Sequence, residues 1–259
     1  MGCEGPGGVM TVAAHMPELI VVPHHELSYD ETLRRDVRSY TLAEIRGFDK
    51  QAANFYARAT GLQETGMSVN EIALLYDLLE KKGKCNIVEL GRNFGTSTRL
   101  FLQHVLRHGG WFESWDLKHW GNLEDTFAAQ GFVVNRMQHA KTDDYDYGLS
   151  VPGAKENLAA IRVANSVMTD IEDKSRWVDF LLIDTEHGIE NALGEYMRWR
   201  NYMNSGSFVA FHDSSLPGVM RAIEIIKETE ASTCGNRLVR EWKNEREDGF
   251  GVAVLEWLG

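Results

Sequence analysis

The chain has 259 residues and a formal net charge of -11, with 43% hydrophobic and 25% charged residues. That length suits one large α/β domain, or one domain with a helical extension, and the composition is typical of a soluble globular protein. The acidic balance, the lack of a basic stripe and the lack of a long apolar run disfavour nucleic-acid-binding and membrane-spanning proteins, so we expect neither partner.

The N-terminal third of the chain precedes any regular pattern of strands. Residues 1–16 are glycine-rich and show no periodicity, which predicts a disordered leader. Apolar residues recur at helical spacing over residues 41–60 and 69–82. We therefore predict an N-terminal helical extension, or cap, over residues 17–83.

From residue 84 onward, short apolar runs alternate with segments of helical periodicity. The predicted strands are 86–90, 110–116, 161–164, 178–184, 207–213, 237–242 and 251–257. The predicted helices are 96–106, 154–160, 189–203 and 218–229. Residues 117–150 are polar, aromatic and irregular, which predicts a long loop or lid with a solvated acidic run at Asp143, Asp144 and Asp146.

Alternating strands and helices predict a Rossmann-like, doubly wound α/β domain over residues 84–259, with helices on both faces of a parallel sheet. A polar turn over residues 244–249 separates the last two strands and predicts a closing antiparallel hairpin. Ligands of such sheets lie at the C-terminal ends of the strands. Those ends carry Glu89, Asp116, Asn165, Asp184 and Asp213.

The three cysteines are Cys3, Cys85 and Cys234, and none of them forms a Cys-x-x-Cys pair. Their number and spacing argue against a disulfide framework and a cysteine-based zinc site. Cys85 is expected to begin a buried strand as an inert apolar residue. The N-terminus lacks a basic stretch followed by an apolar run, so we expect no secretory signal and a cytoplasmic location.

The turn after the first predicted strand is Glu89-Leu-Gly91-Arg-Asn93-Phe-Gly95. Its two glycines permit left-handed backbone angles and a close ligand approach, and the helix that follows directs free amides at that ligand. A dinucleotide fingerprint would have a glycine where Asn93 stands, and Glu89 would repel a pyrophosphate. S-Adenosylmethionine has no phosphate and carries an ammonium and a sulfonium, so the pattern favours this cofactor over NAD.

The predicted cofactor site extends to the neighbouring strand ends. A carboxylate at Asp116 can accept both ribose hydroxyls, although NAD enzymes also use an acid there. The residues that we predict to bind the cofactor are Glu89, Gly91, Asn93, Gly95, Thr96, Ser97, Asp116 and Asp184.

A second cluster follows two later strands, in the segments Asp184-Thr-Glu186-His187 and His212-Asp213. Parallel neighbouring strands would bring the two aspartates within several ångströms of each other. Such oxygen ligands suit Mg²⁺, which would lower the pKa of a bound hydroxyl. A histidine could instead act as general base, or only hydrogen-bond the carboxylates. The candidate metal ligands are Asp184, Asp213 and Glu186, and the candidate catalytic residues are His212, His187 and Asp184.

Four segments together resemble the class I methyltransferases, namely Val88 to Ser97, Trp115-Asp116, Val178 to His187 and Phe208 to Ser214. More narrowly, they are similar to the branch that holds macrocin-type sugar O-methyltransferases and the cephalosporin hydroxylase-like or rhamnosyl O-methyltransferase group. The resemblance covers about residues 68–257. It implies a seven-stranded sheet whose last strand is antiparallel, and S-adenosylmethionine as the cofactor.

The resemblance also implies that Asn165 or Ser166 meets the adenine. In metal-dependent members, acids that match Asp184 and Asp213 hold Mg²⁺, and the third ligand is usually Asp or Asn directly after the second acid. That position is Ser214 here. Glu186 or His187 would have to complete the site, or no ion binds.

We therefore predict methyl transfer to a hydroxyl of a small polar acceptor, a sugar or natural product by family analogy. A homo-oligomer is also compatible with the sequence. The alternatives are a nitrogen acceptor, an NAD-linked oxidoreductase and a non-catalytic binding protein on the same fold.

Overall fold

The structure is a computed structural model. It describes residues 67, 69–92, 95–117, 127–128, 131–138, 145–167, 177–233, 239–244 and 251–257. The predicted leader, the predicted helix over 41–60 and the predicted acids Asp143 and Asp144 lie outside these residues, as does Asn93.

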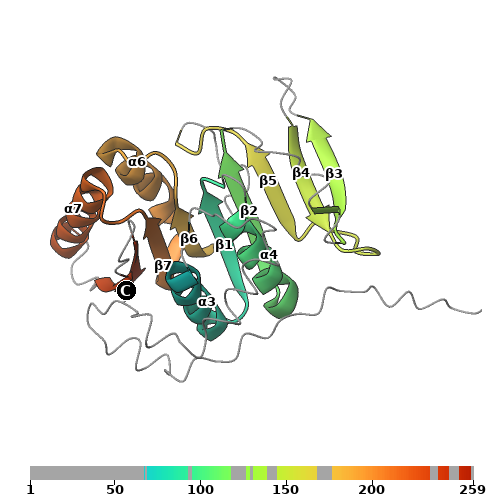
Figure 1. The fold of residues 1–259 in the computed structure, drawn as a ribbon, viewed down its shortest axis with the longest axis horizontal. Coiled ribbons are helices and arrows are strands. Elements are labelled where there is room, and N and C mark those ends of the chain that lie inside the picture. Colours follow the sequence, from blue (N-terminus) through green and yellow to red (C-terminus); the bar gives the residue numbers. More distant parts are fainter. Residues whose placement is uncertain are drawn as a thin grey trace, which may run out of the picture.

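A mixed nine-stranded sheet forms the centre of the described chain, in the order β3-β4-β5-β2-β1-β6-β7-β9-β8 (Figure 1). The strands are β1 (Cys85–Leu90), β2 (Gly110–Asp116), β3 (Val133–Gln138), β4 (Tyr145–Ser150), β5 (Ala159–Val163), β6 (Val178–Ile183), β7 (Met203–His212), β8 (Val239–Asn244) and β9 (Val252–Trp257).

The predicted seven-stranded sheet is present within these nine strands. β5, β2, β1, β6 and β7 run parallel to one another. The last strand, β9, lies antiparallel between β7 and β8, so the predicted closing hairpin is confirmed. The Rossmann-like doubly wound α/β class is therefore the observed fold.

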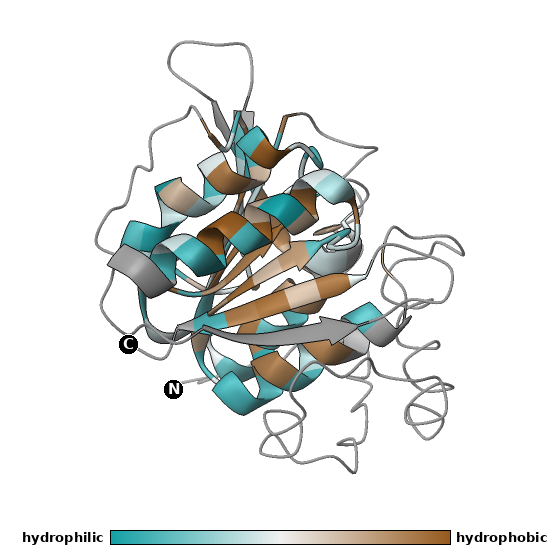
Figure 2. Cartoon of the chain, turned by 90° about the vertical axis from the view of Figure 1, so that its left-hand side faces the viewer, coloured by the Kyte–Doolittle hydropathy of each residue, from teal (hydrophilic) through white to brown (hydrophobic). Residues whose placement is uncertain are grey.

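Helices cover both faces of the sheet. The helices are α3 (Val69–Lys82), α4 (Thr96–His108), α6 (Ile189–Trp199) and α7 (Pro217–Thr233). Figure 2 shows the mostly apolar strands enclosed between helices on either side. Because side chains alternate along a strand, Ile87 joins the apolar cluster beneath α3 and α4, whereas Val88 joins the cluster beneath α6 and α7.

The predicted lid over residues 117–150 is wrong in part, because it contains β3 and β4. These strands form an antiparallel pair that extends the sheet beyond β5. Tyr147 and Leu149 alternate with more polar residues along β4 and are buried in the core beside α4. The alternation in β4 is short and is flanked by polar, turn-forming residues, so it does not stand out in the sequence. It favours a strand when β5 is available to pair with it.

The predicted helix over residues 154–160 is also wrong. Ala159 already belongs to β5, and the preceding segment is an exposed turn. The Leu158 amide donates to the Leu149 carbonyl, and the Leu158 carbonyl accepts from the Phe112 amide. Strand pairing on both sides therefore overrides a local helical preference that is too short to sustain itself. The predicted helix over 189–203 ends earlier, at Trp199, and β7 begins at Met203.

Cys85 begins β1 and is buried, as predicted. Burial, with a further contribution from the charge of Asp179, raises the pKa of its thiol to about 12, so the thiol is protonated and unreactive at neutral pH. Among the described residues no helix is both long and apolar enough to cross a bilayer.

A buried ionic network joins the antiparallel pair β3 and β4 to the neighbouring strands β5 and β2. Asp146, predicted in a solvated loop, is only 4% exposed. Its Oδ2 lies 2.9 Å from Nη1 of Arg162, and its Oδ1 accepts the Val163 amide at 3.0 Å. The Nε of Arg162 donates to Glu113 on β2. One guanidinium thus connects β2, β4 and β5.

Asp146→Ala should lower the free energy of unfolding by about 2 to 3 kcal/mol, because a nearly buried charged hydrogen-bond acceptor is removed from Arg162. Chemical denaturation followed by circular dichroism measures this change. Glu156→Ala, an exposed acid in the turn before β5, should leave the unfolding transition unchanged. Equal stability of both variants would contradict the role given to the network.

Candidate functional site

A cavity of about 600 Å³ opens at the C-terminal ends of the parallel strands. Its lining comes from the segments that follow β1, β2, β5 and β6 and from α6, and it includes Gly91, Asp116, Asn165, Ser166, Asp184 and Glu195. The volume lies in the range of small-molecule and cofactor sites. The cavity therefore occupies the sheet edge at which the sequence predicts the cofactor.

Gly91 fixes the floor of this cavity. It has a φ of 87°, and a Cβ atom at this position would overlap the carbonyl oxygen of Asp184. The Gly91 amide donates to the Trp115 carbonyl at 2.8 Å, and the Asp184 amide donates to the Leu90 carbonyl at 2.7 Å. The ends of three neighbouring strands are thus held together by a residue that has no side chain.

Gly95, the second predicted glycine, also has a positive φ, of 81°, and stands at the N-cap of α4. Thr96 is the first residue of that helix, and the structure does not describe its side chain. Asn93 lies outside the described residues. Gly95 is not among the described residues that line the cavity.

Glu89 and Ser97 were predicted to bind the cofactor directly, and in the structure they instead bind each other. The Glu89 carboxyl group is fully buried and accepts hydrogen bonds from Ser97, Thr98 and Ser114. Neither Glu89 nor Ser97 lines the cavity. The alternation of β1 directs the Glu89 side chain to the α4 face, whereas the cavity borders α6.

Burial raises the pKa of Glu89 to about 7, although the three hydroxyl donors oppose that rise. The carboxyl group therefore anchors the start of α4 against β1 and β2. The Glu89 carboxyl group does not face the cavity, so in this structure it stabilises the fold and does not attract a cationic ligand.

Asp116 does line the cavity, as predicted. Its Oδ2 accepts the backbone amide of Arg92 at 2.9 Å, which ties the glycine turn to the end of β2. The Arg92 side chain is buried, and its Nη1 donates to Ser114 and to the Arg162 carbonyl. These contacts hold the start of the turn, at Arg92, against the end of β2.

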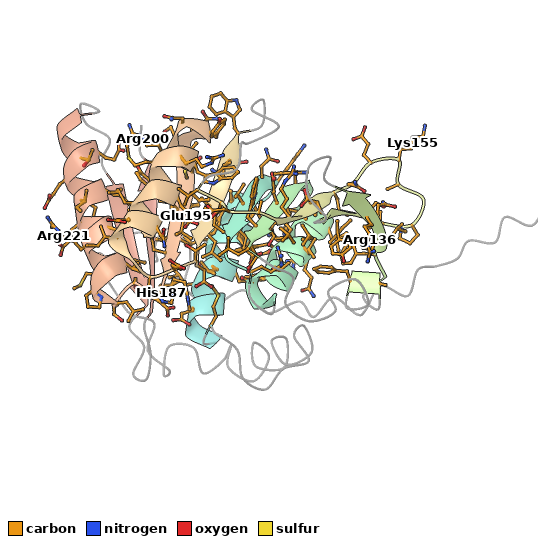
Figure 3. All side chains as sticks on the ribbon, turned by 90° about the horizontal axis from the view of Figure 1, so that it is seen from above. Arg136, Lys155, His187, Glu195, Arg200 and Arg221 are labelled. Atoms are coloured by element: carbon orange, nitrogen blue, oxygen red, sulfur yellow. The ribbon has the colours of Figure 1, made fainter. Side chains whose placement is uncertain are left out.

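Glu195 is a cavity residue that the sequence analysis missed. It lies on the side of α6 that faces the sheet (Figure 3) and is 1% exposed. Its two carboxyl oxygens accept hydrogen bonds from Ser166, after β5, and from Thr185, after β6, the latter at 2.7 Å. Burial raises its pKa to about 7 against the effect of these two hydroxyls. A single acid within an amphipathic helix gives no sequence signal for this bridge.

Asp184 and Asp213 lie together at the rim, as predicted, with His212 between them. The His212 Nδ1 is 2.9 Å from Asp184 Oδ1 and 3.4 Å from Asp213 Oδ2. Its Nε2 is 3.6 Å from Oε2 of Glu71, a buried acid on α3 to which the sequence analysis assigned no role at the site. Burial disfavours the imidazolium, but the three carboxylates outweigh burial and raise the pKa of His212 to about 12.

His187 is placed differently from His212. Its side chain is 44% exposed and lines the cavity, and its Nε2 lies 2.7 Å from Asp213 Oδ2 (Figure 3). Asp213 has a φ of 53°, and it is the one non-glycine residue of the described segments with a positive φ. This strained backbone position at the end of β7 places its carboxylate between the two histidines.

The predicted metal triad of Asp184, Asp213 and Glu186 is not assembled. Glu186 is exposed and accepts a hydrogen bond from Asn191 on α6. The imidazole of His212 takes the third position, within 4.8 Å of both aspartates. Mg²⁺ prefers an oxygen shell with several waters. The residues present therefore fit Mg²⁺ poorly, because a protonated His212 already neutralises part of their charge.

Comparison with known families matches residues 88–214 to a model described as a methyltransferase domain. These residues run from the second half of β1 to just beyond the end of β7 and include every cavity residue discussed above. No curated protein matches the chain.

Similar solved structures include a TDP-rhamnose 3'-O-methyltransferase of calicheamicin biosynthesis, at 14% identity and a TM-score of 0.50, covering 86% of this chain and 98% of that one. An O-methyltransferase of tomaymycin synthesis from Streptomyces achromogenes has 15% identity and a TM-score of 0.47, covering 81% and 89%. A Podospora anserina methyltransferase with bound S-adenosylhomocysteine has 9% identity and a TM-score of 0.49, covering 88% and 93%.

The raised pKa of Glu195 predicts a pH-dependent stability. The folded protein holds this proton more tightly than the unfolded chain, so ionisation destabilises the fold as the pH rises from the ordinary value of 4.5 to about 7. Glu195→Gln removes the carboxyl group and with it this pH-dependent destabilisation. The stability of the variant relative to the original protein should increase by about 2 to 3 kcal/mol between pH 4.5 and pH 8.

Urea denaturation of both proteins at the two pH values measures this difference. Glu190→Gln, an exposed acid on the same helix, serves as the matched control and should keep the original pH dependence. A pH-independent difference between Glu195→Gln and the original protein would contradict the assignment.

Proposed function

We propose that this chain, a class I S-adenosylmethionine-dependent methyltransferase, transfers the methyl group to a hydroxyl oxygen of a small polar molecule. The family match and the Rossmann-like fold establish the methyltransferase class. The hydroxyl acceptor is the part that we infer from the site.

The observation that supports the proposal is the position of His187. An exposed imidazole hydrogen-bonded to an acid stands at the edge of a cavity whose other end carries Asp116, Asn165 and Ser166. Such a pair can accept a proton from a hydroxyl, with Asp213 orienting the ring and stabilising the imidazolium that forms. His212 is 4% exposed and enclosed by carboxylates, so we assign it a positioning role.

The cavity fits the cofactor in two respects. Gly91 lines its floor with backbone atoms, and the missing side chain leaves room for the Asp184 carbonyl, which brings the end of β6 to the same edge. Asp116 is placed to accept the ribose hydroxyls, while Asn165 and Ser166 at the end of β5 would border the adenine, with Leu117 and Val167 as apolar walls. Bound S-adenosylmethionine supplies a methyl group on a sulfonium, and its transfer to a hydroxyl oxygen leaves S-adenosylhomocysteine and a proton.

The protein's own contribution is positioning and proton removal. His187 takes the proton that the acceptor hydroxyl loses, and the carboxylates of Asp184 and Asp213 stabilise the positive charge that collects at this edge. We include no metal ion in this scheme, because His212 occupies the place that a third oxygen ligand would need.

Asp116→Ala should weaken the binding of S-adenosylmethionine about 10- to 100-fold, because it removes the carboxylate to which the ribose hydroxyls would donate hydrogen bonds. Isothermal titration calorimetry measures this change. Asp116→Asn keeps one oxygen for the Arg92 amide and should lose less affinity. Tight NAD binding by a protein that does not bind S-adenosylmethionine would refute the cofactor assignment.

His187→Gln should lower the turnover number about 10²- to 10⁴-fold, the usual contribution of a general base, while the affinity for S-adenosylmethionine stays unchanged. The readout is S-adenosylhomocysteine formation with a panel of hydroxylated acceptors and their amino analogues. Nucleotide-activated sugars come first, because the structure that matches with a TM-score of 0.50 is a TDP-rhamnose 3'-O-methyltransferase.

Arg221→Ala, on the exposed side of α7, is the control and should retain full turnover. Adding Mg²⁺ to chelator-treated protein should change the rate by less than about twofold, because an ion that activates the hydroxyl contributes several kcal/mol. Turnover with amines alone would contradict the hydroxyl acceptor, and unchanged turnover in His187→Gln would contradict the proposed base.

A further inference from the structure

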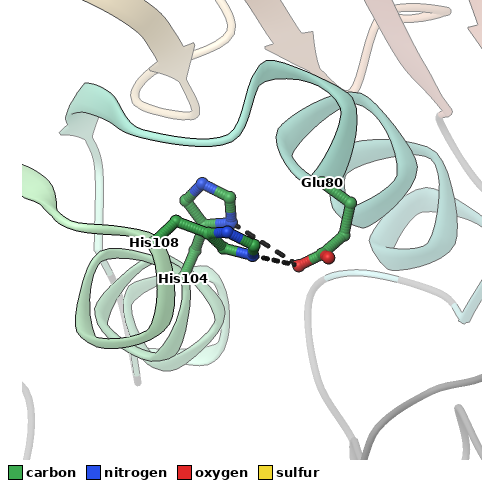
Figure 4. A group of neighbouring side chains, drawn as sticks. All are labelled: Glu80, His104 and His108. Carbon is green, nitrogen blue, oxygen red and sulfur yellow. Dashed lines mark hydrogen bonds and ion pairs between the residues drawn. The ribbon is translucent and has the colours of Figure 1, made fainter.

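A second cluster of ligand-type side chains lies away from the cavity, between α3 and α4. Glu80 stands near the end of α3, and His104 and His108 stand one turn apart on α4 (Figure 4). Oε1 of Glu80 is 3.0 Å from His108 Nε2 and 3.8 Å from His104 Nδ1. One ligand atom from each of the three residues lies within 4.8 Å of the other two.

The tautomer of His104 is fixed by the backbone. Its Nε2 is 2.7 Å from the carbonyl oxygen of Gly83, which can only accept, so this nitrogen carries the hydrogen. The other nitrogen, Nδ1, therefore presents a lone pair. It is buried, and no hydrogen-bond partner for it is found among the described residues.

That lone pair points towards the Glu80 carboxylate, which also presents lone pairs (Figure 4). The separation of 3.8 Å is too long for a hydrogen bond, so a proton on Nδ1 would not bridge the two groups. Two acceptors that face each other in the interior are unfavourable unless a hydrogen-bond donor or a cation lies between them.

We propose that Glu80, His104 and His108 bind a zinc ion that joins α3 to α4. Two imidazoles and one carboxylate form a donor set that suits Zn²⁺, whose bonds to nitrogen and oxygen are about 2.0 to 2.2 Å. Ligand atoms of a tetrahedral zinc site lie about 3 to 4 Å apart, which is the observed spacing to Glu80. The His108 side chain is 25% exposed, so a water can supply the fourth ligand.

The surroundings of the cluster support a metal site. A metal-ligating histidine usually donates its other ring N–H to a carbonyl or carboxylate, as His104 does to Gly83. Arg107 pairs with Oε2 of Glu80 at 2.7 Å and donates to the Tyr76 hydroxyl at 3.0 Å. The guanidinium orients the Glu80 carboxylate, while Oε1 faces the two histidines.

Such an ion would have a structural consequence at the other end of α3. That helix also carries Glu71, which faces His212 at the rim of the cavity. Fastening α3 to α4 therefore holds an acid of the rim in place. Zinc that binds only the folded state should raise the melting temperature, and the rise should continue to grow, logarithmically, with the free zinc concentration.

The test is zinc titration of the full chain after chelator treatment, followed by calorimetry, with Co²⁺ as an optical probe of histidine ligation. The titration is made in the Asp184→Asn variant, so that the acidic rim does not compete for the ion. We expect one equivalent to bind and the melting temperature to rise. His108→Ala should weaken binding at least about 10-fold, since loss of a direct ligand exceeds loss of an outer partner.

His104→Gln, which can still donate to the Gly83 carbonyl, is the second ligand variant and should also weaken binding. Arg107→Gln removes the outer partner of Glu80 and should weaken zinc binding less than either histidine variant, because the guanidinium orients a ligand without contacting the ion. The proposal is overturned if no zinc binds to the Asp184→Asn variant, or if binding survives unchanged in both histidine variants.

Discussion

The close approach of three strand ends at Gly91 is the constraint on which the site depends. No side chain can stand at this position, because the Asp184 carbonyl occupies the space of a Cβ atom. Hydrogen bonds from Gly91 to Trp115 and from Asp184 to Leu90 close the contact. The contact sets the floor of the cavity and brings the end of β6, with Asp184, to the edge where Asp116 ends β2. Any residue with a side chain would separate these two acids.

Buried carboxyl groups around this floor act as internal acceptors for hydroxyl donors. Glu89 collects three hydroxyls beneath α4, and Glu195 bridges Ser166 and Thr185 beneath α6. Burial raises the pKa of both to about 7, so each carboxyl group is costly to ionise, and each contributes to the fold through the hydrogen bonds that it accepts. The two acids stand on opposite faces of the sheet, and together they hold the loops that border the cavity.

Burial also separates the roles of the two rim histidines. His212 is enclosed by Asp184, Asp213 and Glu71, which keep it charged and unable to accept a proton. His187 shares Asp213 with it but is largely exposed to the cavity. The carboxylate of Asp213 thus balances the positive charge of one imidazole and orients the other. In the mechanism that we propose, His187 removes the proton at this acidic rim without a metal ion.

The sequence by itself determined the order of strands and helices, the antiparallel closing hairpin and the acids at the strand ends, because these follow from local periodicity and turn chemistry. Tertiary structure decided which of those acids face the cavity. Glu89 turns to α4 through the alternation of β1, while Glu195 enters from a helix whose sequence shows only an amphipathic face. The pairing of β4 with β5 likewise involves a contact between Asp146 and Arg162, which lie 16 positions apart on different strands, and the pattern within one strand cannot reveal it.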